Sequence, residues 1–365
     1  MPQTLIYIAR SRLHRNRANI IQTLHTAAAF TALGIRVRLY LPPWSRSTRV
    51  EKRLAELGVR SSLEVRPSQF LHSRWTWTGF RMFTVAHGRE FRSAGALYTR
   101  SAEISAALAS AGISHHLEVH EVGYLRKRRL LARLVERHRS GVIKWLIPIS
   151  HAAAVALREA GAVAERIHVS PCGVDLEAYV NVEPFDVNRL DHPRILYVGR
   201  ISGDRGLGIF EALAEREVGE ITLVGEQEEA VRSSPSLRIE PFVPHRDVPR
   251  WYGRADLVLL PYQPELRHAG SLSPMKLFEA MAAGRPIIAS NLPPLREILE
   301  HGKTALLVDP RDVEGWIRAI DMLRRDRVLA ARLAQGAQEL ATRFGWRERA
   351  VGIARALGWD VRETP

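Results

Sequence analysis

The stretch from Ser271 to Ser290, SLSPMKLFEAMAAGRPIIAS, decides the fold. Its pattern predicts a loop, then a helix over residues 274–283, then a cap at Gly284 and a buried strand over residues 286–289. A helix that passes through one glycine into a short apolar strand is typical of an α/β sheet with parallel strands.

The first turn of this helix has the features of an anion site. Ser273 would cap the helix and Pro274 would take its first position, so that free N–H groups and the positive end of the helix dipole face a ligand. Lys276 lies where a helix favours an acid, and Glu279 lies where a carboxylate can accept hydrogen bonds from a ribose diol. The alternative is an ordinary amphipathic helix with both side chains exposed to solvent.

The same alternation of strand and helix extends in both directions along the chain. In the second half the other expected strands are Arg194–Val198, Glu220–Val224, Asp256–Leu260 and Ala305–Val308, and the expected helices are Ile209–Arg216 and Val313–Gly345. In the first half the expected strands are Leu5–Ala9, Ile35–Leu41, Leu63–Val65, Ala96–Thr99, His116–Val119 and Val142–Ile149, with a helix at Asn19–Leu33. Both halves therefore predict a doubly wound, Rossmann-like sheet.

The chain has 365 residues, which is more than one hydrophobic core normally holds. The segment Pro171–Phe185 carries a turn signal without periodicity, and we expect it to be the linker. We predict one domain over residues 1–180, a second over residues 181–345, and a helix over residues 346–365 that crosses back to the first domain. Ligands of such sheets bind at the loops that follow the strands.

The composition narrows the class of protein. With 46% hydrophobic and 25% charged residues, the chain is neither disordered nor fibrous. A single cysteine, Cys172, excludes an internal disulfide and a Cys-rich zinc site, and it favours a reducing cytosol. We expect no membrane span, because no window approaches the roughly 18 consecutive apolar residues that one needs, and no secretory signal.

The net charge of +14 lies in the first half of the chain. Residues 1–180 contain 27 Lys and Arg against 12 Asp and Glu, whereas the remainder contains 26 against 27. This asymmetry indicates that the first half faces an anionic partner, such as a membrane surface, a phosphorylated acceptor or a nucleic acid. The alternative is an arginine-rich protein with a solvated basic face. No recognised nucleic-acid-binding motif is present, so we do not expect that partner.

Two segments of the first half combine basic and apolar residues, as peripheral membrane proteins do. In residues 125–139 one helical stripe is apolar and arginines surround it; the stripe is Leu130, Leu131, Leu134, Val135 and His138. In residues 70–83 aromatic and basic side chains alternate; they are Arg74, Trp75, Trp77, Phe80, Arg81 and Phe83. The alternative is that the apolar side chains face a core and the arginines are merely exposed.

The stretch 271–290 resembles the donor-site signature of family 4 of the retaining glycosyltransferases, also called glycosyl transferases group 1. The similarity continues through four other segments, which are Ile147–Asp175, Tyr197–Gly206, Asp256–Pro261 and Glu297–Pro310. It covers residues 145–320 well and the first 140 loosely. The resemblance implies the GT-B fold, an α/β architecture of two Rossmann-like domains that face each other across a deep cleft.

The resemblance also implies a role for individual residues. Arg200 and Arg205 would clamp the donor diphosphate, and Glu279 would hold the ribose. His120 would lie near the donor sugar and its anomeric carbon, where it can stabilise the transition state. The implied catalytic residues are His120, Arg200 and Arg205, and the implied donor-binding residues are Gly199, Ser271, Leu272, Ser273, Lys276 and Glu279. Leu272 and Ser273 would contribute backbone N–H groups.

The chain departs from the family pattern in two places. Ser271 stands where relatives often carry a glutamate that contacts the sugar, and Glu265 is an uncertain substitute. The loop Arg10–Asn19 replaces a glycine-rich loop of the first domain. The loop has four arginines, which are Arg10 and the three candidate acceptor residues Arg12, Arg15 and Arg17. They would suit a phosphate-bearing acceptor, or they form a solvated loop.

The sequence has no Asp-x-Asp motif and no cluster with metal-ligand spacing, so we expect neither a metal nor a cofactor. The hypothesis is a cytoplasmic enzyme, peripheral on the inner face of the membrane, that moves a sugar from a UDP- or GDP-sugar to a glycan or lipid-linked acceptor. Two alternatives remain: another GT-B enzyme such as a sugar-nucleotide epimerase, and a non-enzymatic basic scaffold or nucleic-acid-binding protein with a vestigial donor site.

Overall fold

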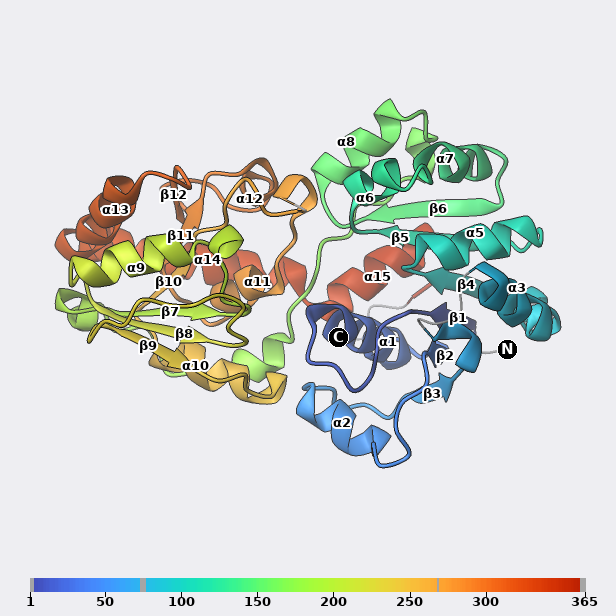
Figure 1. The fold of residues 1–365 in the computed structure, drawn as a ribbon, viewed down its shortest axis with the longest axis horizontal. Helices are drawn as coiled ribbons and strands as arrows, with labels where there is room; N and C mark the ends of the chain where they lie inside the picture. The colour runs from blue at the N-terminus through green and yellow to red at the C-terminus, as the bar shows by residue number, and fades with distance from the viewer. Residues whose placement is uncertain (1–2, 73–76, 268, 362–365) are drawn as a thin grey trace. The chain divides into compact units, whose positions relative to one another are not determined.

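The structure is a computed structural model that describes residues 3–72, 77–267 and 269–361. The chain divides into two compact units (Figure 1). Unit 1 consists of Met1–Cys172 together with Trp346–Pro365, and unit 2 is Gly173–Gly345.

Unit 1 is a parallel sheet of six strands in the order β3-β2-β1-β4-β5-β6. The strands are β1 (Thr4–Ile8), β2 (Arg36–Leu41), β3 (Glu64–Pro67), β4 (Ala96–Thr99), β5 (His115–Val119) and β6 (Ile143–Pro148). The α-helices are α1 (Ala18–Ala32), α2 (Val50–Glu56), α3 (Trp77–Ala86), α4 (Gly88–Ser93), α5 (Ala102–Ser110), α6 (Val122–Lys127), α7 (Leu131–Arg139), α8 (His151–Glu159) and α15 (Trp346–Ala356). The sheet order reverses between β1 and β4, which is the point where Rossmann-like sheets bind ligands.

Unit 2 repeats this topology, with the order β12-β11-β10-β7-β8-β9. The strands are β7 (Arg194–Val198), β8 (Glu220–Val224), β9 (Leu237–Glu240), β10 (Leu257–Leu260), β11 (Ile287–Ser290) and β12 (Leu306–Val308). The α-helices are α9 (Leu207–Glu215), α10 (Val248–Arg254), α11 (Met275–Ala282), α12 (Pro293–Arg296), α13 (Val313–Arg325) and α14 (Arg327–Ala341). The switch point lies between β7 and β10.

The division between the units differs from the predicted boundary at residue 180. It falls after Cys172, because the residues that follow pack within unit 2. Val174 donates its N–H to the carbonyl of Phe344, and the Tyr179 ring lies edge-on to that of Tyr252, 6.0 Å between centroids.

The helix α15 belongs to unit 1, where it lies beside α1 (Figure 1). The rings of Trp346 on α15 and His25 on α1 stack at 5.5 Å. The expected single helix Val313–Gly345 is instead two helices, because Asp326 ends α13 and its carboxylate accepts the N–H of Leu329 in α14 at 2.8 Å.

The two segments expected at a membrane surface are largely part of the core. On α7 the side chains of Leu131, Leu134, Val135 and His138 are buried, and on α3 those of Phe80 and Phe83 are buried. Trp77 is exposed, while Arg74 and Trp75 lie outside the described residues. Within the three described ranges, every helix is too short or too polar to span a bilayer.

Candidate functional site

The carboxyl end of β7 in unit 2 brings three cationic side chains together. Lys276 reaches back from the first turn of α11, and its Nζ donates to the Tyr197 Oη at 2.9 Å. Arg200 and Arg205 follow β7 directly, and both exert an electrostatic effect on Lys276. Tyr197 in turn donates its hydroxyl to the carbonyl of Arg200 at 3.0 Å, which ties the amine to the loop.

The loop after β7 leaves room for this amine because it begins with a glycine. Gly199 has φ +145, and a Cβ on it would lie 2.0 Å from the Lys276 Nζ. A side chain at this position would therefore displace the amine. The left-handed backbone at the same residue is also one that other residues rarely adopt.

The two arginines have acidic partners in unit 2. Arg200 donates one guanidinium nitrogen to both carboxylate oxygens of Glu228, at 2.9 and 3.2 Å. Arg205 is buried and donates to the Asp204 carboxylate at 2.8 Å and to the Ser202 hydroxyl at 3.2 Å. These contacts hold the arginines at the end of the sheet.

The cation cluster perturbs Lys276. Burial and then the neighbouring Arg205 lower its pKa from 10.5 to about 7. An anion with two charged oxygens would relieve the repulsion among the three cations, so the cluster matches a diphosphate.

Glu279 lies one turn further along α11 and is buried. Its carboxylate oxygens each meet a ring side chain: the His245 Nε2 at 2.8 Å from Oε1, and the Tyr252 hydroxyl at 3.2 Å from Oε2. Tyr252 also donates to the carbonyl of Lys276 at 3.1 Å. These two contacts hold the carboxylate in a fixed position. His245 lies beside it and offers a nucleoside a second polar side chain.

The helix α11 begins later than predicted. Pro274 is the N-cap, with extended backbone angles and no side-chain cap bond, and the first helical residue is Met275. The prediction that Ser273 caps the helix is wrong. Pro274 has an extended backbone with ψ 125°, so it still belongs to the loop and the helix begins at the next residue.

The remaining predicted donor residues lie in the preceding loop. Ser271, Leu272 and Ser273 are all buried there. Glu265, the proposed substitute for the missing glutamate, is exposed and pairs with Arg311. The structure thus places Lys276 and Glu279 on one helix, close to Arg200 and Arg205, and leaves Glu265 at the surface.

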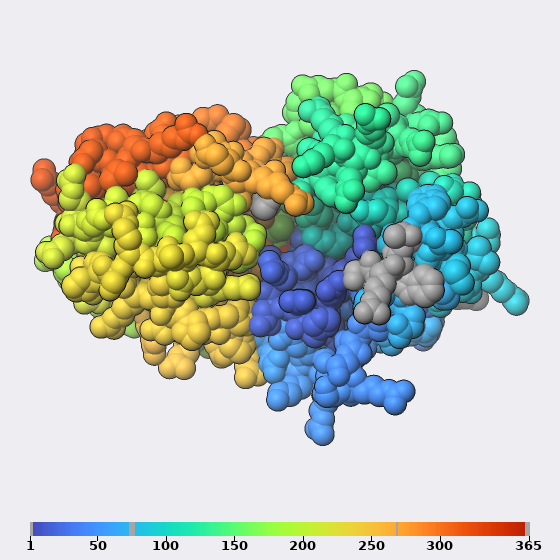
Figure 2. Space-filling model, in the orientation of Figure 1, coloured from blue at the N-terminus to red at the C-terminus, as the bar shows by residue number. Residues whose placement is uncertain are grey.

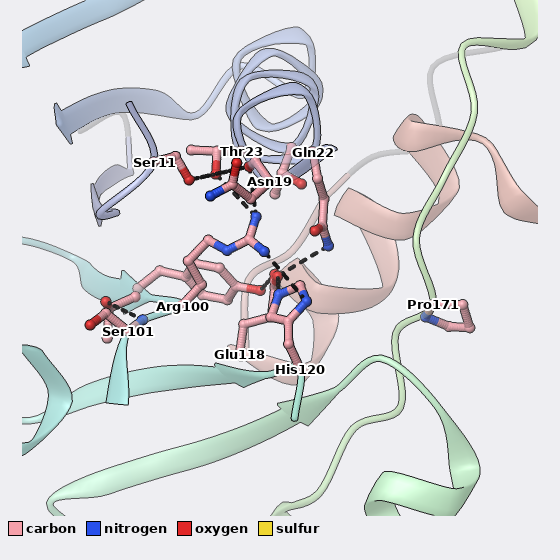
Figure 3. A network of polar contacts seen from close by, with 12 residues as sticks. Ser11, Asn19, Gln22, Thr23, Arg100, Ser101, Glu118, His120 and Pro171 are labelled. Carbon is pink, nitrogen blue, oxygen red and sulfur yellow. Dashed lines mark hydrogen bonds and ion pairs between the residues drawn. The ribbon is translucent and has the colours of Figure 1, made fainter. Parts of the chain in front are cut away.

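His120 in unit 1 directly follows β5 and belongs to a polar network (Figure 3). The side chains of Gln22 and Thr23 on α1, Arg100 after β4 and Glu118 on β5 point toward one another and toward the imidazole. Burial, followed by the positive charge of Arg100, lowers the pKa of His120. The ring is therefore neutral at neutral pH.

Of the four arginines of the N-terminal loop, Arg10 and Arg12 are half-buried, whereas Arg15 and Arg17 are exposed at the surface of unit 1. Arg53 of α2 holds the loop through the carbonyls of Leu13 and Arg15, at 2.9 and 3.0 Å. In Figure 2 this dark-blue loop is exposed next to the light blue of α2. The loop is a fixed, basic surface.

Three site residues were not foreseen: His245, Tyr252 and Tyr197. His245 follows β9, and that strand was missed because its sequence, Leu237–Glu240, alternates weakly and is polar. Recognition of β9 would have indicated His245, because ligands of such sheets bind at the loops that follow the strands.

The comparisons with known proteins agree with this geometry. Residues 192–326, all in unit 2, match the family model described as glycosyl transferases group 1. The D-inositol 3-phosphate glycosyltransferase of Xylanimonas cellulosilytica is 30% identical over 231 residues, 56% of this chain and 54% of that protein. The 2-deoxystreptamine N-acetyl-D-glucosaminyltransferase of Niallia circulans is 31% identical over 165 residues, 41% of each chain. The chain thus spans about half the length of the curated relatives it matches, or less.

Solved structures match nearly the whole chain in fold. The sucrose-phosphate synthase of Thermosynechococcus elongatus superposes with a TM-score of 0.75 at 17% identity, over 97% of this chain and 98% of that one. The Anabaena protein HepE in complex with UDP has a TM-score of 0.75 at 18% identity, over 98% and 100%. With both sheets parallel and six-stranded, the chain has the GT-B fold, and residues 192–326 are similar to the glycosyl transferases group 1.

Proposed function

We propose that the chain is a retaining glycosyltransferase that moves a hexose from a UDP- or GDP-sugar to a glycan or glycolipid acceptor. The observation that carries the proposal is the convergence of Lys276, Arg200 and Arg205 at the carboxyl end of β7. Each curated relative named above is a glycosyltransferase by name, and HepE was solved with UDP.

In this proposal the residues of unit 2 bind the donor. Arg200, Arg205 and Lys276 hold the diphosphate, assisted by backbone N–H groups of Leu272 and Ser273. Glu279 accepts hydrogen bonds from the ribose hydroxyls, and its contacts with His245 and Tyr252 fix its orientation. Ser271 is assigned to the sugar because it stands where relatives often carry the glutamate that contacts the sugar.

The reaction exchanges one bond at the anomeric carbon for another. The bond from that carbon to the diphosphate oxygen breaks, the acceptor oxygen bonds to the same carbon on the same face, and the acceptor proton passes to the departing diphosphate. The three cations stabilise the charge that develops on the diphosphate. We assign His120 to the sugar because the family resemblance implies that role, and its neutral ring would add no positive charge next to the developing oxocarbenium ion.

We also propose that unit 1 takes the acceptor and faces an anionic surface. Unit 1 contains 31 Lys and Arg against 13 Asp and Glu, and unit 2 contains 22 against 26. Since the leucines of α7 are buried, the contact would be electrostatic. It would be made by exposed basic residues at the end of α6, in the α6–α7 turn and on α7: Arg126, Lys127, Arg128, Arg129, Arg133, Arg137 and Arg139. Arg12, Arg15 and Arg17 would meet an acceptor phosphate.

Calorimetry with UDP, GDP and ADP tests the donor site. At least one diphosphate should bind, and Arg205→Ala should weaken the binding, whereas Arg216→Ala, which breaks an exposed ion pair with Glu314, should not. The absence of binding to all three nucleotides would refute the proposal. A screen of sugar nucleotides for release that depends on an added acceptor then separates a transferase from an epimerase, which needs no acceptor.

A further inference from the structure

A buried ion pair lies under His120 in unit 1. Glu118 is two residues before His120, so that both side chains leave the extended chain on the same side. The Glu118 side chain is 0% exposed and that of its partner Arg349 is 3% exposed. Their oxygen and nitrogen atoms are 2.7 Å apart.

The Glu118 carboxylate accepts four hydrogen bonds, which saturate it. Oε1 accepts from Gln22 at 3.1 Å and from the His120 Nε2, and Oε2 accepts from Arg349 and the hydroxyl of Tyr98. Burial alone would raise the pKa of Glu118, but Arg349 and His120 bring it well below its usual value. The group is therefore a buried anion.

Arg349 connects this anion to both points where the chain crosses between the units. It lies on α15, four residues after Gly345, and its Nε donates to the carbonyl of Pro171 at 2.9 Å, just before the other crossing. A further guanidinium nitrogen donates to the Thr26 hydroxyl at 3.0 Å. One side chain thus joins both crossings to α1 and β5.

The two ring nitrogens of His120 meet opposite partners. Nε2 contacts the Glu118 carboxylate, which can only accept, and Nδ1 lies 3.4 Å from the Arg100 guanidinium, which can only donate. The partners assign the proton to Nε2 and the lone pair to Nδ1. Asn19 and Thr23 fix Arg100 in turn, at 2.8 Å from the Asn19 carbonyl and 3.2 Å from the Thr23 hydroxyl (Figure 3).

From this arrangement we infer that Glu118 and Arg349 are positioning residues, which hold the His120 imidazole in one tautomer and one orientation for sugar transfer. The inference deepens the proposed function and rests on it for the role of the ring. The charged groups that act on the ring are Arg100 after β4, Glu118 on β5 and Arg349 on α15. A neutral, fixed ring does not repel the positive charge that develops at the anomeric carbon.

A purely structural pair would also destabilise the protein when broken, so stability alone does not distinguish the two roles. Nitrogen-15 NMR of the imidazoles does, because it reports the tautomer and the pKa of each ring. The chain has 14 histidines, and the spectrum of His120→Gln identifies the signal of His120.

In the intact protein the His120 signal should show the Nε2–H tautomer and a pKa below 6.5. Glu118→Gln removes an anion that raises this pKa and should lower it further, whereas Arg100→Met should raise it. Glu90→Gln is the matched control, since Glu90 is a half-buried carboxylate whose partners, Arg38 and Tyr40, lie in another network. It should leave the His120 signal unchanged.

A second variant covers the case in which Glu118→Gln does not fold. Glu118→Gln together with Arg349→Gln leaves no unpaired buried charge, and the amide at position 118 can face the ring with its oxygen or its nitrogen. Both substitutions are made together with Arg100→Met, so that no guanidinium fixes the lone pair at Nδ1, and the His120 signal should then show both tautomers. A fixed Nε2–H tautomer in this triple variant would overturn the inference, as would an ordinary pKa or mixed tautomers in the intact protein.

The kinetic arm uses the donor and acceptor found by the screen. Glu118→Gln should lower kcat by about tenfold or more, because a misplaced ring loses its productive geometry, with donor KM changed less than about threefold. The donor residues lie on unit 2, so a large rise in donor KM with kcat unchanged would count against positioning. The NMR experiment tests the positioning of His120 even if no sugar transfer is found. The transfer assay tests the proposed function even if the ring is not fixed, so the two proposals can fail separately.

Discussion

Lys276 makes the binding of a nucleoside diphosphate depend on pH. With a pKa of about 7, its amine is half protonated near neutrality. A bound diphosphate favours the charged amine and raises its pKa toward the ordinary value of 10.5. Above pH 7, binding must therefore take up a proton, and the affinity for UDP or GDP falls as the pH rises.

The size of the effect follows from the pKa of the free protein. At pH 8.5 roughly one amine in 30 is charged, so the affinity should be about 30-fold weaker than at pH 6, or about 2 kcal/mol. At pH 8 binding should take up about 0.9 proton. Unfolding responds in the opposite direction: the unfolded chain binds the extra proton between pH 7 and 10.5, so the stability of unit 2 should rise with pH across that window.

Calorimetry at pH 8 in two buffers of different ionisation enthalpy measures the proton uptake directly. Lys276→Met should bind more weakly at pH 6, with no proton uptake and a flat pH profile from 7 to 8.5. Lys276→Arg, which stays charged, is the control for charge without titration, and its profile should also be flat. If the intact protein takes up no proton, or if Lys276→Met takes up as many as the intact protein, the reasoning is wrong.

Three further predictions concern the donor site and the buried pair. Glu279→Ala should weaken UDP binding by about 1.5–3 kcal/mol and abolish the preference for UDP over its 2′-deoxy analogue; Glu265→Ala should keep both, and a preference that survives in Glu279→Ala would exclude the ribose contact. Gly199→Ala places a methyl group 2.0 Å from the Lys276 amine and should cost at least tenfold in UDP affinity by calorimetry, whereas Gly208→Ala, with nothing within 4 Å, should cost nothing. Arg349→Met leaves the Glu118 carboxylate buried without its ion-pair partner, and unfolding in denaturant should show a loss of about 3–5 kcal/mol in the stability of unit 1. The control is Arg347→Ala, an exposed position on the same helix, which should change the stability by less than about 0.5 kcal/mol. Equal losses in the two variants would mean that the buried ion pair is not decisive.

The proposed membrane contact has its own test. Unit 1 should bind vesicles that contain anionic phospholipid and release them as the salt concentration rises, because exposed arginines rather than inserted leucines make the contact. Vesicle sedimentation measures this. Replacing Arg126, Arg128 and Arg129 together by Gln should weaken it, and binding that ignores lipid charge would contradict it.

The sequence predicted the fold well where the hydrophobic pattern is strong. Strands β4, β7 and β8 have the predicted bounds, because each is a short apolar run between clear breakers. β9 was missed because it is polar, and with it the loop that carries His245. The start of α11 was one residue early, since the cap rule does not anticipate an extended Pro274.

The candidate site likewise has parts that the sequence predicts and parts that it does not. Lys276 and Glu279 could be predicted because their spacing on one helix is readable from the sequence. The contact of Glu118 with Arg349 could not, because 231 residues separate them and no local pattern links a strand to the final helix. The stripe on α7 was ambiguous: a membrane-facing and a core-facing leucine stripe have the same period, and only the packing separates them.

The split of unit 1 between two segments affects how the protein is made. Residues 1–172 leave the ribosome first, but α15 follows only after all of unit 2. Until then Glu118 has no Arg349 to neutralise it, and α1 lacks the stacking of Trp346 on His25. Unit 2 is continuous and can complete its core while unit 1 waits, so the nascent chain should acquire its nucleotide site before the ring of His120 is fixed.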